Sequence, residues 1–217
     1  MSTPVTVCVP TLRRYDCLFD LVDSLRASTI KPNVSIIDNG NNPQMLKPVL
    51  QLAEQSELRT DVFIPKMNLG VAASWNWFIQ NIPEDRIITN DDVVFAPDSI
   101  QKMIDAKRDD VDIIYESNCG FSCYLLRDSC VKKVGLYDET ISPGYGYYED
   151  EDYMTRIRKE KAGALALDAG MFHKHTQTLE ATPWNEIQDH HRKFALAKQN
   201  YINKWGGMPD VVKASFM

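Results

Sequence analysis

The stretch Ile87-Ile88-Thr89-Asn90-Asp91-Asp92-Val93-Val94-Phe95 decides how this chain folds. Its apolar and β-branched residues are typical of a short buried strand, whereas adjacent carboxylates are rarely buried unless they are paired or bind a cation. We therefore expect a strand that ends at Asn90, with Asp91 and Asp92 at its carboxyl edge. In open α/β sheets ligands bind at that edge, and two carboxylates there suit Mg²⁺ or Mn²⁺ carrying a phosphorylated ligand. The alternative is a surface turn, since Asp-Asp pairs are common in turns.

The segments around this stretch predict one α/β domain with a mostly parallel central sheet flanked by helices. A β-branched run at 5–9 stops at Pro10, and a helix with an apolar stripe and a second strand at 34–37 follow it. This β-α-β order implies neighbouring parallel strands. Further strands are expected at 61–64, 112–115, 119–126 and 163–167, the last of them at the edge of the sheet.

Composition narrows the classes of function. The chain has 217 residues, of which 44% are hydrophobic and 25% charged, as is usual for a soluble globular protein. A net charge of −6 argues against nucleic acid or an anionic membrane surface as the main partner. The sequence has no apolar run of transmembrane length and no signal-peptide pattern, so we expect no integral membrane segment. Five cysteines in mostly apolar contexts favour a reduced, cytoplasmic compartment.

A second acidic cluster, Glu149-Asp150-Glu151-Asp152, follows a loop rich in glycine and tyrosine at 143–148. Acidic residues also complement the dipole of a helix N-terminus, which is the purely structural explanation. Four of them exceed that need, and crowded carboxylates raise one another's pKa, as a catalytic acid or base requires. Further on, alternation in His173-Lys174-His175 puts both imidazoles on one face, although such pairs are more often surface residues than metal ligands. His190 and His191, in a polar helix, are expected at the surface.

Taken in order, these motifs resemble the family-two-like glycosyltransferases of GT-A fold over most of the chain. Each motif is weak alone, and their shared order and spacing carry the resemblance. The matching pieces are Pro10-Thr11-Leu12-Arg13, Ile36-Ile37-Asp38-Asn39, Asn68-Leu69-Gly70-Val71-Ala72, Asn90-Asp91-Asp92, Gly120-Phe121 through to Glu139, and Tyr148-Glu149-Asp150-Glu151-Asp152. Within the family the chain is most similar to rhamnosyltransferase-type enzymes that build bacterial or viral surface glycans.

The resemblance implies that 1–95 bind a nucleotide-diphosphate sugar, with UDP favoured and dTDP next. Asp92 would hold Mn²⁺ or Mg²⁺ against the diphosphate, with His173 as the first and His175 as the second candidate for a later metal ligand. The family's metal motif usually opens with Asp, and Asn90 in that place keeps an oxygen donor but loses the charge. The implied nucleotide and donor residues are Pro10, Thr11, Arg13, Asp38, Asn68, Gly70, Asn90 and Asp91.

For 96–217 the resemblance implies an acceptor-binding half and a C-terminal helix, within one domain at 1–217. Asp150 matches the carboxylate that deprotonates the acceptor hydroxyl in inverting members, and Glu149 lies beside it. The acceptor would be a glycan or a glycoprotein. Its expected contacts are Trp75, Gly120, Tyr147 and Asp152, and the candidate sugar platforms are Trp75, Tyr145, Tyr147 and Trp184.

Other functions remain open at this point. A retaining transferase of the same fold would not use Asp150 as a base. A catalytically silent nucleotide- or carbohydrate-binding module would not need both acidic clusters. A sugar-phosphate nucleotidyltransferase or a dinucleotide dehydrogenase needs a glycine-rich signature after the first strand, and Pro10-Thr11-Leu12-Arg13-Arg14 contains no glycine.

Overall fold

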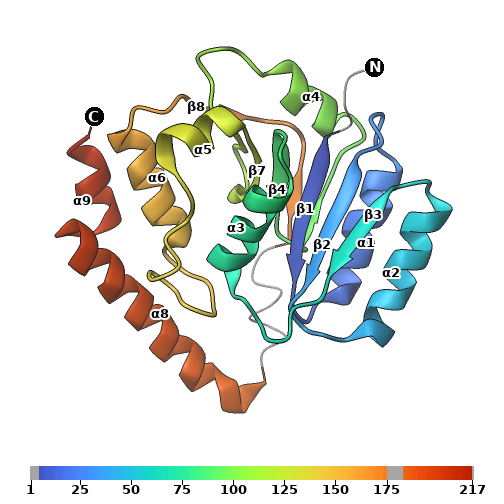
Figure 1. Ribbon diagram of the computed structural model, residues 1–217, viewed down its shortest axis with the longest axis horizontal. Helices are drawn as coiled ribbons and strands as arrows, with labels where there is room; N and C mark the ends of the chain where they lie inside the picture. Colours follow the sequence, from blue (N-terminus) through green and yellow to red (C-terminus); the bar gives the residue numbers. More distant parts are fainter. Residues whose placement is uncertain (1–4, 175–182, 217) are drawn as a thin grey trace.

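A central sheet organises the computed structural model, which describes residues 5–174 and 183–216. Its strands are β1 (Thr6–Thr11), β2 (Asn33–Asp38), β3 (Thr60–Phe63), β4 (Arg86–Thr89), β6 (Ile113–Glu116), β7 (Gly120–Leu126) and β8 (Ala164–Leu167). They form a seven-stranded sheet in the order β3-β2-β1-β4-β7-β6-β8 (Figure 1). The expected strands are therefore present, and β8 is an edge strand as predicted.

Most strand pairs in this sheet are parallel. β1 pairs in parallel with β2 and β4, β2 with β3, and β6 with β8. Only β7 runs the other way in the described sheet, antiparallel to both β4 and β6. The prediction of a mostly parallel sheet is confirmed, and β1 and β4 end side by side at one edge.

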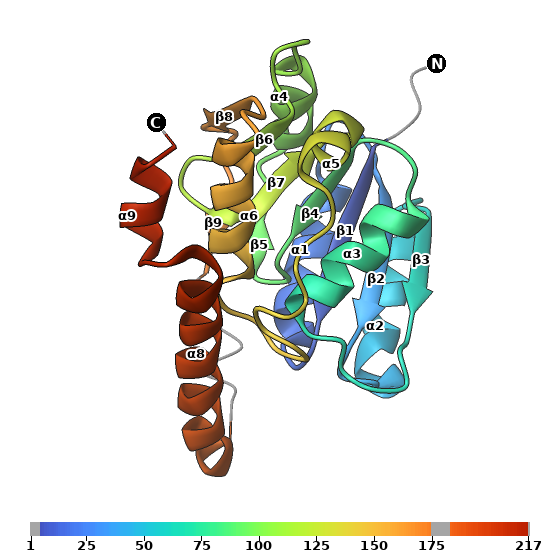
Figure 2. The same cartoon turned by 60° about the vertical axis from the view of Figure 1, so that its left-hand side comes forward.

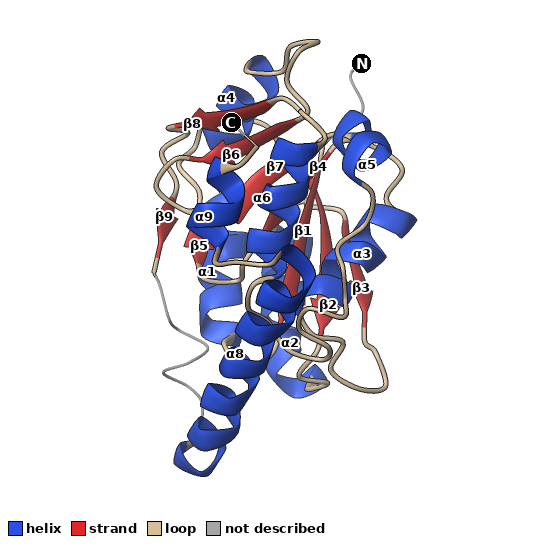
Figure 3. Ribbon diagram, turned by 90° about the vertical axis from the view of Figure 1, so that its left-hand side faces the viewer, coloured by secondary structure: helices blue, strands red, loops and turns tan. Residues whose placement is uncertain are grey.

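Helices cover both faces of the sheet (Figure 1, Figure 3). Alternation along β1 separates the two cores, because Val7 and Val9 point to one face and Cys8 to the other. The first face packs against α1 (Tyr15–Arg26), α2 (Pro43–Gln55) and α4 (Ser99–Asp105). The second face packs against α3 (Val71–Asn81), α5 (Asp128–Val134) and α6 (Glu149–Lys159). The sheet is therefore buried on both sides, as parallel sheets require.

The C-terminal part of the chain lies outside this three-layer body. The long helix α8 (Trp184–Trp205) and the short α9 (Pro209–Ala214) lie beside α6 (Figure 2). The Tyr201 hydroxyl, in α8, shares a hydrogen bond of 2.6 Å with the Thr155 hydroxyl of α6, and Lys204 forms an ion pair of 2.7 Å with Asp138. These contacts fix α8 so that its N-terminal half extends toward the carboxyl edge of β1 and β4.

Candidate active site

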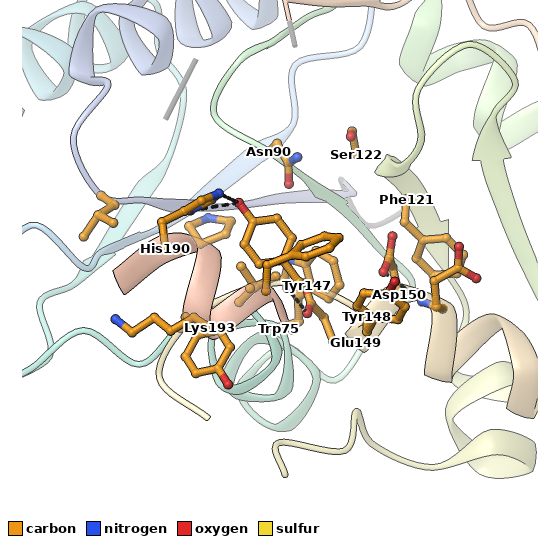
Figure 4. A pocket seen from close by; sticks show the side chains of 18 of the residues that line it. Trp75, Asn90, Phe121, Ser122, Tyr147, Tyr148, Glu149, Asp150, His190 and Lys193 are labelled. Carbon is orange, nitrogen blue, oxygen red and sulfur yellow. Dashed lines mark hydrogen bonds between the residues drawn. The ribbon is translucent and has the colours of Figure 1, made fainter. Parts of the chain in front are cut away.

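An open cavity of about 1030 Å³ lies at the carboxyl edge of β1 and β4 (Figure 4). Its wall brings together segments that are far apart in the sequence, at 10–13, 68–71, 90–92, 119–122 and 144–151, and several residues of α8. Most of the sequence-predicted site residues border this cavity: Pro10, Thr11, Arg13, Asn68, Gly70, Trp75, Asn90, Asp91, Asp92, Gly120, Tyr147, Glu149, Asp150 and His173. The two acidic clusters therefore face one opening.

Asp91 is held at the end of β4 by the end of β1. The Thr11 hydroxyl donates a hydrogen bond of 2.7 Å to Asp91 Oδ2, and Asp91 is only 6% exposed. Burial raises the pKa of Asp91 to about 7, while the Thr11 hydrogen bond opposes the shift and the neighbouring Asp92 carboxylate adds to it. A cation that binds beside Asp91 would stabilise the ionised form of its carboxyl group.

Asp92 and His173 meet across a second, two-stranded sheet. β5 (Val93–Val94) pairs with β9 (Phe172–His173), with Val93 opposite His173, and the amide N–H of Lys174 donates to the carbonyl of Asp92 at 3.0 Å. As a result His173 Nε2 lies 3.0 Å from Asp92 Oδ1. That oxygen is buried and accepts no hydrogen bond from any residue that the structure describes, despite the short contact. Buried carboxylate oxygens rarely lack a hydrogen-bond donor.

This pair fits a divalent cation. Two ligands on neighbouring positions of an octahedral ion with bonds of about 2.1 Å lie about 3.0 Å apart, so the separation suits a shared metal. Carboxylate and amide oxygens suit both Mn²⁺ and Mg²⁺, and the imidazole favours the transition metal Mn²⁺ of the two. Asn90, which also borders the cavity, offers a further oxygen. Among the described residues no group of three His, Cys, Asp or Glu converges on one point, so an ion held here would need further ligands from a bound molecule or from water. His175 lies outside the described residues.

The second acidic cluster begins α6 after a strained turn. Tyr147 and Tyr148 have φ of 122° and 65°, in the left-handed region that bulky residues avoid. Glu149 holds the turn, because its Oε2 accepts hydrogen bonds from the Ser142 hydroxyl at 2.9 Å and from the Tyr147 amide at 2.5 Å. The turn brings Asp150 to the cavity wall (Figure 4). A strained backbone conformation of this kind persists only where surrounding contacts hold it in place.

Both carboxyl groups of this turn have raised pKa values. Burial, together with the charge of Asp150, raises the pKa of Glu149 to about 7. Burial also raises the pKa of Asp150, while its hydrogen bond from the Glu151 amide, at 2.8 Å, opposes the shift. A carboxylate whose pKa is raised is a stronger proton acceptor, which is the property that a general base needs.

Gly70 brings the cavity wall at the start of α3 into contact with the loop that leads to this turn. It has φ of 78°, and a Cβ atom there would lie 2.4 Å from the Tyr145 backbone nitrogen. The next residue, Val71, donates its amide to the Tyr145 carbonyl at 2.9 Å. Only glycine allows so close an approach at this φ, so the first turn of α3 lies directly against the loop that carries Tyr147.

Asp38, which we expected to contact the nucleotide base, does not border the cavity. Its side chain is fully buried, its Oδ1 accepts hydrogen bonds from the Tyr15 hydroxyl at 2.5 Å and the Gly40 amide at 3.1 Å, and its Oδ2 accepts from the Asn42 amide at 3.1 Å. The carboxylate therefore stabilises the turn after β2, and its neighbour Asn39 borders the cavity instead.

Two of the predicted acceptor contacts also have structural roles. Trp75 borders the cavity but is only 3% exposed, because its ring packs against Tyr124 and Tyr137 at centroid distances of 5.7 and 4.9 Å. Asp152 does not border the cavity and is fully buried. Its carboxylate pairs with Arg156 and accepts from the Trp205 indole, each at 2.9 Å, which ties α6 to the end of α8. The proposed platform Trp184 is 86% exposed and lies outside the cavity wall.

The sequence did not reveal that α8 forms one wall of the cavity. His190, expected at the surface, lies there with its Nε2 3.1 Å from the Tyr147 hydroxyl, and Phe194 packs edge-on against Tyr147 at 5.1 Å. Ala197 and Tyr201 are fully buried on the same helix. The spacing 190, 194, 197 and 201 is that of one helix face, so it could have predicted that His190 faces the protein.

Solved structures of the same fold define the class of this protein. The S. aureus TarS fragment 1–349 matches with a TM-score of 0.60 and 11% identity, covering 92% of this chain and 66% of that one. Glucosyl-3-phosphoglycerate synthase from Mycobacterium tuberculosis, solved with Mn²⁺, UDP and glucosyl-3-phosphoglycerate, matches at 0.56 and 12%, covering 94% and 81%. GalNAc-T7 with UDP, GalNAc and Mn²⁺ matches at 0.66 and 10%, covering 98% of this chain and half of that one. The fold is that of the GT-A glycosyltransferases.

Sequence comparison makes the assignment narrower. Residues 6–121, more than half of the chain, match glycosyl transferase family 2, and the chain belongs to that family. No curated protein matches the chain significantly in sequence. Within the described ranges, no helix has the length and apolar character needed to cross a bilayer.

Proposed function

We propose that this protein transfers a sugar from a nucleoside-diphosphate donor, with UDP favoured, to a hydroxyl group of a glycan or glycoprotein acceptor. The observation that carries the proposal is the meeting of Asp91 and Asp92 with Glu149 and Asp150 around one cavity. A sugar nucleotide needs both functions, because its diphosphate must be bound and the attacking hydroxyl must lose a proton. The solved relatives that contain UDP or UDP-GlcNAc support this donor class.

In this proposal 1–95 supply the donor side of the cavity. Pro10, Thr11 and Arg13 line the nucleotide site, and Asn68 with Gly70 shapes it at the start of α3. Asp92 and His173 would hold Mn²⁺ or Mg²⁺. When bound, such an ion neutralises the charge that develops on the leaving diphosphate.

Asp150 acts as the general base on the acceptor side, which belongs to 96–217. The acceptor oxygen forms a bond to the anomeric carbon as its proton passes to Asp150. The bond from that carbon to the diphosphate oxygen breaks, and the nucleoside diphosphate leaves with the electron pair. Direct displacement of this kind inverts the anomeric centre. Glu149 positions the base, since its carboxylate holds the strained Tyr147–Tyr148 turn from which Asp150 follows.

The test is release of nucleoside diphosphate from UDP-, dTDP- and GDP-sugars, including dTDP-rhamnose, in the presence of Mn²⁺ and a panel of glycans. We expect turnover of one donor, reduced about 10²- to 10⁴-fold by Asp150→Asn because that substitution removes the proton acceptor. Asp109→Asn, at an exposed carboxylate far from the cavity wall, is the matched control. Tight nucleotide binding without release from any donor would instead show a silent binding module.

A further inference from the structure

Aromatic rings surround the end of the cavity at which Asp150 lies. Phe194 is 42% exposed and packs against Tyr148 at a centroid distance of 5.6 Å. The Tyr147 ring lies 5.1 Å from that of Phe194, and Phe121 stands beside Asp150 (Figure 4). Phe121, Tyr147 and Tyr148 are all half-buried, so parts of their rings are open to a ligand.

The charged groups at the same end are mostly acidic. Glu149, Asp150 and Glu151 follow one another in the cavity wall, and Asp210, in the α9 helix that packs against α6, borders the cavity as well. One nearby lysine, Lys213, is already engaged, since its ammonium group lies 2.5 Å from Glu151 Oε2. A ligand with a phosphate or carboxylate group would meet like charge here, which costs free energy in a partly buried site.

The cationic side chains that border the cavity are engaged as well. Among the described lining residues these are Arg13, which pairs with Glu186 at 2.6 Å, and Lys193, which pairs with Asp189 at 2.8 Å. Lys193 also lies 5.6 Å from the centroid of the Tyr145 ring. An anionic acceptor would have to share either residue with a carboxylate that already partly neutralises its charge.

We infer that the acceptor presents an uncharged sugar ring to Asp150, with no phosphate or carboxylate close to the hydroxyl that reacts. This inference rests on the proposed function and adds the chemical class of the acceptor. The C–H face of a pyranose carries a small positive charge and stacks on the negative face of an aromatic ring, here Phe194 and Tyr148. Sugar hydroxyls donate hydrogen bonds to the carboxylates of Glu151 and Asp210, which act purely as acceptors in their ionised form.

The experiment compares matched acceptors, using the donor that the protein turns over. Each pair consists of a neutral alkyl glycoside and the same glycoside carrying a 6-phosphate. We expect kcat/KM to be at least tenfold higher for the neutral member. Asp210→Lys removes a negative charge and adds a positive one on an exposed residue of α9, so it should narrow that ratio. Equal or faster reaction of the phosphorylated member would overturn the inference.

Substitutions at Phe194 test whether the sugar stacks on this aromatic ring. Phe194→Ala should raise KM for the neutral acceptor about tenfold, the equivalent of an aromatic contact of roughly 1.4 kcal/mol, and Phe194→Tyr should restore it. Leu196→Ala, at a residue of α8 that is 46% exposed and lies off the cavity, is the control. An unchanged KM in Phe194→Ala would contradict stacking on this ring.

Nucleotide binding and donor hydrolysis, measured on the same preparation, separate the two claims. If the donor is bound and hydrolysed but no neutral glycoside accelerates release, the acceptor inference fails and the proposed donor chemistry stands. If no nucleotide binds, the proposed function fails, and the acceptor inference fails with it.

Discussion

Asp92 Oδ1 lies 3.0 Å from His173 Nε2, although the two residues belong to distant parts of the chain. The pairing of β5 with β9 sets this distance, because Val93 is the strand partner of His173. A backbone interaction between two very short strands thus brings a carboxylate and an imidazole together beside a cavity. Neither residue is more than 12% exposed, so both side chains are held in place by their surroundings.

Replacing His173 should weaken the metal-dependent binding of nucleotide. We expect His173→Ala to lower the affinity for UDP in the presence of Mn²⁺ by about 10- to 100-fold, since loss of even a supporting group at a metal site has that effect. A ligand that binds the folded state raises its melting temperature, so the stabilisation by Mn²⁺ with UDP should largely disappear in a thermal-shift measurement. His191→Ala, at an exposed histidine of α8, should leave the stabilisation by Mn²⁺ with UDP intact. If His173→Ala keeps the full Mn²⁺-dependent stabilisation, the pair is an ion pair only.

The pH dependence of transfer should follow the carboxylate of Asp150. This group must be ionised to accept a proton, and burial raises its pKa, so the rate should fall on acidification at a pH above the usual range of an aspartate. Glu151→Gln removes a neighbouring negative charge that raises the pKa of Asp150, so it should move the midpoint to lower pH. The profile of kcat/KM between pH 4 and 8 measures both effects. A midpoint that stays in place in Glu151→Gln would mean that another group is the base.

Trp75 should matter for stability more than for acceptor binding. Because its ring packs in the core against Tyr124 and Tyr137, Trp75→Ala should lower the free energy of unfolding by about 3–5 kcal/mol. Phe194→Ala truncates a ring that is 42% exposed and should lower it far less. Denaturant unfolding of both variants makes the comparison. A small loss in Trp75→Ala would restore the hypothesis that this ring serves the ligand.

Gly70→Ala should disturb the site, whereas the same change at Gly206 should not. Both glycines have φ of 78°, so an added methyl group costs each about 1 kcal/mol in backbone conformation. At Gly206 the methyl group meets nothing within 4 Å, but at Gly70 it would lie 2.4 Å from the Tyr145 backbone. We therefore expect a larger loss of melting temperature and a loss of transfer activity in Gly70→Ala alone. Equal behaviour of the two variants would show that the contact with the Tyr145 loop is not important.

Strands and acidic motifs were predictable from the sequence because their signals are local. The run ending at Asn90 and the β-branched segments before Pro10 give the sheet, and the ends of parallel strands must meet at one edge. The placement of Asp91 and Asp92 beside Glu149 and Asp150 followed from the order of motifs shared with the family. These predictions required only the order and spacing of motifs along the chain.

Burial and long-range docking were not predictable in the same way. Asp38 and Asp152 both have the carboxylate that ligand binding requires. Their oxygens, however, accept hydrogen bonds from residues of other helices, Tyr15 for Asp38 and Trp205 for Asp152. His190 reaches the cavity because α8 docks on α6 through residues such as Tyr201, an arrangement that depends on tertiary contacts. A charged side chain in a sequence therefore shows what chemistry is possible, while its partners decide whether that chemistry is available.

The central claim, a metal-assisted nucleotide site at Asp92, is tested most directly by calorimetric titration with UDP. The titration is done with and without Mn²⁺ on the wild type, on Asp92→Ala and on Asp98→Ala, a control at a carboxylate that is 54% exposed. We predict binding that depends on Mn²⁺ in the wild type and in Asp98→Ala, and its loss in Asp92→Ala. Wild-type protein that binds neither UDP, dTDP nor GDP in the presence of Mn²⁺ would contradict the account.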